Sequence, residues 1–212
     1  MTTRVAKLNA THPGEAILRE AVQFLNQGEP IAFPTETVYG LGAHAGIDRA
    51  IELIYEIKGR TPDKPLPVMI ANYAMLNLIA ENISKDAQKL MQAFWPGPLT
   101  LVLHAKRSLS PLISGKTGTV AVRYPRHEVP IKMLQALNHP IVATSANLSE
   151  NVPPQSAEDV MAQLNGRIPL ILDAGKSEFG KESTILDCTG EKIKVLREGA
   201  LTPDKLKPFL TW

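Results

Sequence analysis

Residues 31–60 read IAFPTETVYGLGAHAGIDRAIELIYEIKGR, and this stretch decides the fold class. Its first three residues form an apolar run before Pro34, which predicts a short buried strand. Residues 35–47 contain three glycines and predict a loop in which glycine serves turns with positive φ. From Asp48, a helix-capping residue type, apolar residues recur at helical spacing until Gly59. A buried strand followed by an amphipathic helix is typical of an α/β fold.

The same alternation continues on both sides of this stretch. The spacing of apolar residues predicts further helices over 13–27, 84–95, 129–137 and 156–164. Short apolar runs predict strands at 68–70, 99–104, 119–123, 140–143, 170–172, 183–187 and 193–196. Because strands alternate with helices and then cluster at the end, we expect one α/β domain over residues 1–212 with a mixed parallel and antiparallel sheet.

Length and composition exclude several classes of protein. The chain has 212 residues, 44% of them hydrophobic and 21% charged, which is typical of one soluble domain and not of a disordered tail, a collagen-like fibre or a coiled coil. A single cysteine, Cys188, excludes an internal disulfide and a cysteine-rich zinc site. No apolar run reaches the roughly 18 residues of a membrane helix, and the first residues lack a signal sequence, so we expect a cytoplasmic protein without a membrane partner. A net charge of +2 argues against a nucleic-acid coat protein.

The common catalytic motifs are missing from the sequence. It contains no phosphate-loop motif, no zinc-protease HExxH motif and no GxSxG nucleophile elbow. The five histidines lack metal-ligand spacing, and Cys188 lies in an apolar pattern that predicts a core position. We therefore expect neither a protein metal site nor a cysteine nucleophile.

Three polar segments remain as candidates. Lys58 and Arg60 flank a glycine at a predicted helix end, and prolines follow, which fits either ordinary helix capping or a rigid phosphate pocket. Residues 144–147, TSAN, follow the strand predicted at 140–143, where α/β sheets bind ligands, although a turn or helix cap explains them equally well. Arg123 is a cation at the end of an otherwise apolar strand.

Seven strings, taken together and in this order, resemble the YrdC/TsaC family of threonylcarbamoyl-AMP synthases. Each string is weak evidence alone, but the ordered set spans nearly the whole chain. They are residues 33–42 (FPTETVYGLG), 58–60 with 64–66 (KGR and KPL), 94–101 (FWPGPLTL), 120–123 (VAVR), 145–149 (SANLS), 183–185 (STI) and 196–199 (LREG).

This resemblance implies a single α/β domain whose twisted sheet contains a large concave cavity. It implies a nucleotidyltransferase that joins L-threonine, bicarbonate or CO2, and ATP into threonylcarbamoyl-AMP and pyrophosphate, for threonylcarbamoyladenosine modification of tRNA. A related subgroup lacks the Lys-x-Arg and Ser-x-Asn pairs; both are present here and favour the synthase. The chain ends at Trp212 and so resembles the short form of the family.

The resemblance also assigns roles to individual residues. Lys58 and Arg60 would be catalytic and would bind ATP together with Ser145, Asn147 and Arg197. Thr35, Arg123 and Ser183 would bind threonine, with Arg123 suited to its carboxylate. Mg²⁺ would be bound with the ATP phosphates and not by a protein cage. The expected partners are downstream tRNA threonylcarbamoyl transfer proteins, and tRNA itself is a further candidate. The surplus of prolines, 17 in all, predicts stiff rims around the cavity.

Two departures from the family pattern concern loops near these residues. Thr61 stands directly after the Lys-x-Arg pair, where the family often has proline, and Pro62 follows it. Glu150 stands where the family usually has glycine and places a negative charge near the expected nucleotide site.

Two other functions compete with the synthase. A non-catalytic RNA-binding module of the same fold could use the cations at 58, 60, 123 and 197, although an aromatic content of 5% leaves few stacking platforms. A carbamoyl-adenylate-forming domain for another substrate, as in hydrogenase maturation proteins, would be expected with acylphosphatase-like and zinc-finger regions, which this sequence lacks.

Overall fold

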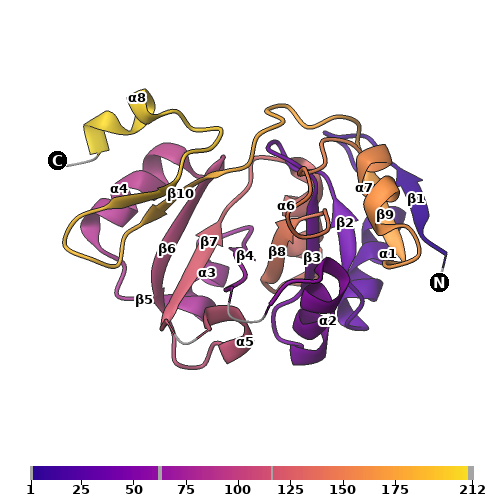
Figure 1. The fold of residues 1–212 in the computed structure, drawn as a ribbon, viewed down its shortest axis with the longest axis horizontal. Helices are drawn as coiled ribbons and strands as arrows, with labels where there is room; N and C mark the ends of the chain where they lie inside the picture. Colours follow the sequence, from indigo (N-terminus) through magenta and orange to yellow (C-terminus); the bar gives the residue numbers. More distant parts are fainter. Residues whose placement is uncertain (1, 62–63, 116, 210–212) are drawn as a thin grey trace.

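A long mixed sheet runs through the molecule, with helices packed around it (Figure 1). The computed structural model describes residues 2–61, 64–115 and 117–209. The strands are β1 (Arg4–Lys7), β2 (Ile31–Phe33), β3 (Gly40–His44), β4 (Val68–Met69), β5 (Ala80–Glu81), β6 (Leu99–Ala105), β7 (Thr119–Arg123), β8 (Ile141–Ser145), β9 (Leu170–Asp173), β10 (Thr184–Asp187) and β11 (Lys194–Arg197). The helices are α1 (Glu15–Asn26), α2 (Asp48–Lys58), α3 (Tyr73–Ile79), α4 (Lys85–Phe94), α5 (Pro111–Ser114), α6 (Glu128–Leu137), α7 (Ala157–Leu164), α8 (Pro203–Leu206) and the 3₁₀ helix η1 (Lys207–Phe209).

The strand order is β1-β9-β2-β3-β8-β4-β7-β6-β10-β11, with β5 paired to β6. The sheet contains parallel pairs, such as β1 with β9 and β6 with β10, and antiparallel pairs, such as β3 with β8 and β6 with β7. The prediction of an α/β fold with a mixed sheet is therefore confirmed.

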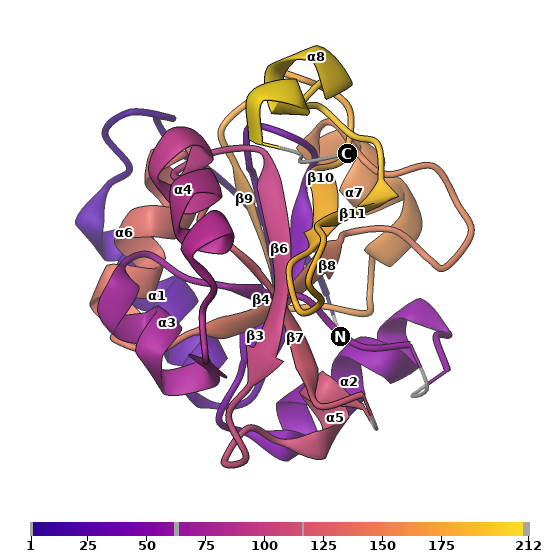
Figure 2. The ribbon, with the colours of Figure 1, turned by 90° about the vertical axis from the view of Figure 1, so that its left-hand side faces the viewer.

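The short strand β4 joins two groups of strands. It pairs with β8 on one side and with β7 on the other, so only Val68 and Met69 link the two groups at this point. In Figure 1, β6, β7 and β10 lie to the left of β4, and β8, β3, β2 and β9 lie to the right. Figure 2, turned by 90°, shows α1, α3, α4 and α6 on one side of the strands, with α2 and α7 on the other.

Helix boundaries follow local capping chemistry. Ser84 caps α4 by accepting a hydrogen bond from the Ala87 amide, and Ser156 forms a capping box with Asp159 at the start of α7. Helix α2 ends at Gly59, whose φ of 61° is the left-handed conformation that glycine adopts most easily. The prediction that Asp48 caps α2 is wrong by one residue. Ile47 is the cap and Asp48 opens the helix, where its carboxylate accepts a hydrogen bond from the Ser110 hydroxyl.

Strand β3 contradicts the loop expected at residues 35–47. Gly40 and Gly42 lie in this strand, and neither has a positive φ, so the interpretation of these glycines as turn residues is wrong. The aromatic ring of Phe33 on β2 covers both glycines: a Cβ on Gly40 would lie 3.0 Å from that ring and a Cβ on Gly42 2.8 Å. Close packing, and not turn geometry, therefore requires glycine at these positions.

Strand β8 is longer than the predicted 140–143 strand. Thr144 and Ser145 are its last two residues and pair with β3, so they belong to the strand and do not follow it. Besides β3, six elements were not predicted: β1, α3, β5, α5, α8 and η1. Among the described residues, no helix is long and apolar enough to cross a membrane.

Candidate active site

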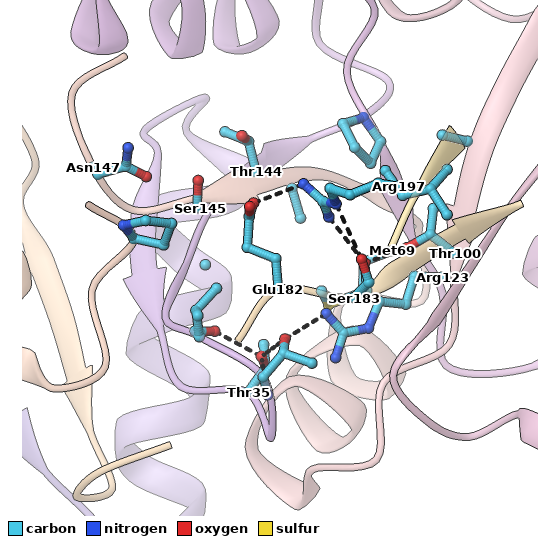
Figure 3. Close-up of a pocket in the computed structure, with 18 of the residues that line it drawn as sticks. Thr35, Met69, Thr100, Arg123, Thr144, Ser145, Asn147, Glu182, Ser183 and Arg197 are labelled. Carbon is cyan, nitrogen blue, oxygen red and sulfur yellow. Dashed lines mark hydrogen bonds and ion pairs between the residues drawn. The ribbon is translucent and has the colours of Figure 1, made fainter. Parts of the chain in front are cut away.

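A cavity of about 540 Å³ lies between the two groups of strands and holds the candidate site (Figure 3). This volume is in the range of ordinary small-molecule pockets. Pro65, Pro67 and Pro153 are part of its wall. All eight sequence-predicted site residues line it: Thr35, Lys58, Arg60, Arg123, Ser145, Asn147, Ser183 and Arg197. The structure brings these eight residues together in one cavity, and their individual roles stay predictions.

Lys58, the last residue of α2, is buried in the wall of the cavity. Its Nζ donates hydrogen bonds of 2.6 Å to the backbone carbonyls of Ser145 and of Asn147, which tie the end of α2 to the end of β8. Burial, together with the nearby charge of Arg60, lowers the pKa of Lys58 to about 8. Because an ammonium group has three N–H donors, one remains for a ligand.

Arg60 follows the helix and lies against the proline-rich segment after it. Its Nη2 donates to the Pro65 carbonyl at 3.0 Å, and its Nε donates to the Lys64 carbonyl at 3.4 Å. Lys64 and Pro65 also line the cavity, so this segment forms part of its rim. Pro62, which follows Thr61 in this segment, lies outside the described residues.

Asn147 is held by its amide nitrogen. Its Nδ2 donates to the carbonyls of Leu148 and Asn151 at 2.7 and 2.8 Å, whereas its buried Oδ1 has no hydrogen-bond partner among the described residues. A buried unpaired acceptor is unfavourable unless a ligand supplies a donor. Asn147 can therefore accept one hydrogen bond from a bound molecule.

Arg123, at the end of β7, is a buried cation of the site. Its Nη1 donates to the Thr37 hydroxyl at 2.7 Å and its Nε to the Gly97 carbonyl at 3.3 Å. The Thr37 hydroxyl is in turn 2.9 Å from that of Thr35, which donates to the Val38 carbonyl. The loop that contains Thr35 and Thr37 thus orients the guanidinium group through direct contact.

Glu36 forms a buried ion pair with Arg123. Glu36 Oε2 lies 2.9 Å from Arg123 Nη2, with both side chains at most 10% exposed. Neither of these two atoms makes a well-aligned hydrogen bond, so the contact is one of charge. The other oxygen of Glu36 accepts a hydrogen bond from the Arg126 amide. Arg123 lines the cavity and Glu36 does not, so Glu36 balances the charge of Arg123 from outside the cavity.

Arg197, at the end of β11, binds the segment before β10. Its Nε donates to the Ser183 carbonyl at 3.1 Å, its Nη2 to the Ser183 hydroxyl at 3.3 Å, and its Nη1 to the Glu182 carboxylate at 2.8 Å. The Ser183 hydroxyl is also 2.7 Å from that of Thr100. Ser183 therefore lies where the predicted ATP-binding and threonine-binding residues meet.

Gly199 permits this arrangement by close backbone packing. A Cβ at this position would lie 2.3 Å from the Glu182 carbonyl oxygen and from the Ser183 carbonyl carbon. The Thr184 hydroxyl holds the same turn by accepting hydrogen bonds from the amides of Gly199 and Leu201. The glycine in the LREG string is thus explained by close contact between two backbone segments.

Thr37, Glu36 and Glu182 contact the predicted site residues, although no role was expected for them from the sequence. Thr37 and Glu36 stand inside the first quoted string without an assigned role, and Glu182 directly precedes the serine of the STI string. Their proximity to assigned residues was the available signal, but their contacts with Arg123 and Arg197 depend on the fold. Glu150 does line the cavity, as its position in the sequence suggested, with a positive φ of 71°.

Cys188 and two of the histidines lie outside the cavity. Cys188 is buried outside the cavity, and burial raises its pKa to about 12, which agrees with a core position. His44 and His139 stack with ring centroids 4.2 Å apart and do not line the cavity. Within the described part of the chain, no group of three His, Cys, Asp or Glu side chains could hold a metal ion.

The site thus combines many hydrogen-bond donors with few acids. Five cationic side chains line the cavity, and only Glu150 and Glu182 oppose them there among the described residues; the cations are Lys58, Arg60, Lys64, Arg123 and Arg197. Such a cavity favours anionic groups and can orient them with fixed backbone and side-chain dipoles.

Comparison with known proteins identifies the family. The model of the Sua5/YciO/YrdC family, described by the words telomere recombination, matches residues 23–199. The chain belongs to this family. The resemblance inferred from the ordered strings is therefore confirmed.

Relatives within the Sua5/YciO/YrdC family are similar over most of this chain. Threonylcarbamoyl-AMP synthases of Pyrococcus abyssi and Bacillus subtilis are each 42% identical to it, over 91% of its length. The chain spans 57% and 56% of these two relatives. The crystal structure of P. abyssi Sua5 complexed with L-threonine superposes with a TM-score of 0.94 at 40% identity, over 98% of this chain and 61% of that one.

Proposed function

We propose that this protein is an L-threonylcarbamoyladenylate synthase, which joins L-threonine, bicarbonate or CO2, and ATP into threonylcarbamoyl-AMP and pyrophosphate. The observation that carries the proposal is the meeting of all eight predicted residues in one cavity. The names of the similar relatives and the threonine complex of P. abyssi Sua5 support it. The product would serve threonylcarbamoyladenosine modification of tRNA, with downstream transfer proteins as partners.

The chemistry needs alignment and charge neutralisation more than proton transfer. The neutral amine of threonine forms an N–C bond with CO2 and loses one proton to solvent, which gives a carbamate. A carbamate oxygen then attacks the α-phosphorus of ATP, a new P–O bond forms, and pyrophosphate leaves with the electrons of the broken bond. Such a step depends on positioned cations and hydrogen-bond donors. This reaction therefore needs no covalent nucleophile from the protein.

The residues divide into two groups for this reaction. Lys58, Arg60 and Arg197 would hold the phosphates, with Ser145 and Asn147 contacting the nucleotide. The unpaired Oδ1 of Asn147 supports a contact with a hydrogen-bond donor of the ligand, such as an amino or hydroxyl group.

The second group would hold the amino acid. Arg123 would bind the threonine carboxylate, in the orientation that Thr37 and Glu36 impose, and Thr35 and Ser183 would bind its polar groups. Mg²⁺ bound with the ATP phosphates would neutralise part of their charge, and phosphate oxygens and water would be among its ligands.

The test is pyrophosphate release measured with and without each of L-threonine and bicarbonate. The purified protein should release pyrophosphate only when both are present with ATP. Release without threonine would refute the proposed substrate. Steep, salt-dependent tRNA binding without ATP turnover would instead favour the RNA-binding alternative.

Arg60→Ala should lower this turnover at least about 100-fold while leaving the fold intact, because a positioned cation at a developing charge is lost. The control is Arg107→Ala, an exposed arginine outside the cavity, which should keep wild-type turnover. Wild-type turnover in a folded Arg60→Ala variant would refute the role of Arg60.

A further inference from the structure

Glu182 is a carboxylate in a cavity built for anions. It lines the wall together with five cations, and Glu150 is the other acid there among the described residues. Its side chain is 34% exposed, so its charge reaches the cavity. In Figure 3 the Glu182 side chain extends between Arg197 and Ser145, two of the residues expected to bind ATP.

The two oxygens of Glu182 differ in their contacts. Oε1 accepts a hydrogen bond from Arg197 Nη1 at 2.8 Å. Oε2 makes no hydrogen bond or ion pair with any described residue, so its lone pairs are available to a ligand. The charge of Glu182 also acts on Lys58, because it raises the pKa of that lysine and opposes the effect of burial.

The single positive charge of Arg197 would have to balance both the Glu182 carboxylate and a bound phosphate. Each of its three nitrogens already donates to Glu182 or Ser183. A polyphosphate that approaches Arg197 therefore also approaches the carboxylate, and the two negative groups repel each other at short range. A cation between them would turn this repulsion into attraction.

A divalent cation fits this position chemically. Magnesium binds oxygen ligands and commonly uses one or two carboxylates together with substrate phosphates. The described residues contain no three-ligand metal cluster, so the cation would arrive with the nucleotide.

We propose that Glu182 is the protein ligand for the divalent cation that accompanies ATP, so that nucleotide binding depends on the metal. This inference rests on the proposed function, because it takes ATP as the ligand of the cavity. A purely cationic cavity would instead bind metal-free ATP, which has more negative charge, at least as tightly as its magnesium complex.

The experiment measures ATP binding by titration calorimetry, without threonine, in Mg²⁺ and in EDTA at equal ionic strength. Wild-type protein should bind ATP at least about tenfold more weakly in EDTA. Glu182→Gln keeps an acceptor for Arg197 but removes the charge, so its affinities in Mg²⁺ and in EDTA should differ by less than about twofold. Circular dichroism checks that the variant is folded.

Glu150→Gln is the matched control, since it removes the other carboxylate of the same cavity. It should keep the wild-type dependence on Mg²⁺. The inference is overturned if wild-type binding is insensitive to Mg²⁺. It is also overturned if ATP binding by Glu182→Gln keeps the full dependence on Mg²⁺. A third contrary result is that Glu182→Gln binds ATP more tightly than wild type by the same factor in Mg²⁺ and in EDTA, because Glu182 would then only repel the phosphates. If wild-type protein binds no ATP in Mg²⁺ and releases no pyrophosphate, the proposed function itself fails.

Discussion

The lowered pKa of Lys58 makes ATP affinity sensitive to pH in an accessible range. Lys58 is 3% exposed, and burial is the main cause of a pKa of about 8, against an ordinary 10.5. Burial disfavours the charged form, so the ammonium loses its proton as the pH rises through 8. If the phosphates of ATP bind the ammonium form, affinity is highest at low pH and decreases above pH 8.

The size of the effect follows from the protonated fraction. With a pKa of about 8, Lys58 is about nine-tenths protonated at pH 7 and about one-tenth protonated at pH 9. The dissociation constant for ATP should therefore rise about tenfold between these two values, equivalent to about 1.4 kcal/mol. A lysine with the ordinary pKa of 10.5 would stay almost fully charged up to pH 9. The dissociation constant for ATP would then change by less than about a tenth.

The assay is calorimetric titration of ATP at pH 7, 8 and 9, with Mg²⁺ and ionic strength constant. Lys58→Met should bind more weakly at pH 7 and should lose the pH dependence. Lys64→Met removes a second lysine of the cavity but keeps Lys58, so it should retain the tenfold change. A wild-type constant that stays level to pH 9, or a pH response that survives in Lys58→Met, would refute the reasoning.

Two further variants test packing and orientation. Gly199→Ala should lower the free energy of unfolding by about 3 kcal/mol, because its Cβ would overlap the Glu182 carbonyl; thermal denaturation measures this. Gly190→Ala, with its nearest neighbour 3.8 Å away, should change stability little, and equal losses in both variants would contradict the explanation. Thr37→Val removes the acceptor of Arg123 Nη1 and should raise the KM for threonine about tenfold, with ATP binding unchanged. Unchanged threonine kinetics would show that Thr37 does not orient Arg123.

Local sequence signals predicted the elements whose residues are typical of their structure. Helix α2 has an apolar stripe and a terminal glycine, and β7 at 119–123 is an apolar run with the predicted boundaries. Strand β3 was not predicted because Gly40 and Gly42 have low strand propensity. Glycine is required at both positions by the ring of Phe33, which lies on another strand. Helix α3 has only seven residues and gives too short a pattern for helical periodicity.

For the site, short sequence strings likewise predicted residues but not the contacts between distant segments. The ordered strings were sufficient to collect eight residues that line one cavity. They did not reveal how Glu36 and Thr37 hold Arg123, or that Glu182 faces the cavity beside Arg197. These contacts join segments that are far apart in the chain, so spacing alone carries no signal for them.

The pairing of β1 with β9 has a consequence for how the protein folds. Arg4 pairs with Leu170, and β10, which follows β9 in the chain, pairs with β6 at the other side of the sheet. During synthesis the first strand therefore has no partner until β9 has left the ribosome. Because closing long loops costs entropy before distant contacts form, we expect slow folding with late assembly of the cavity. Refolding followed by tryptophan fluorescence and by ATP binding would measure this delay.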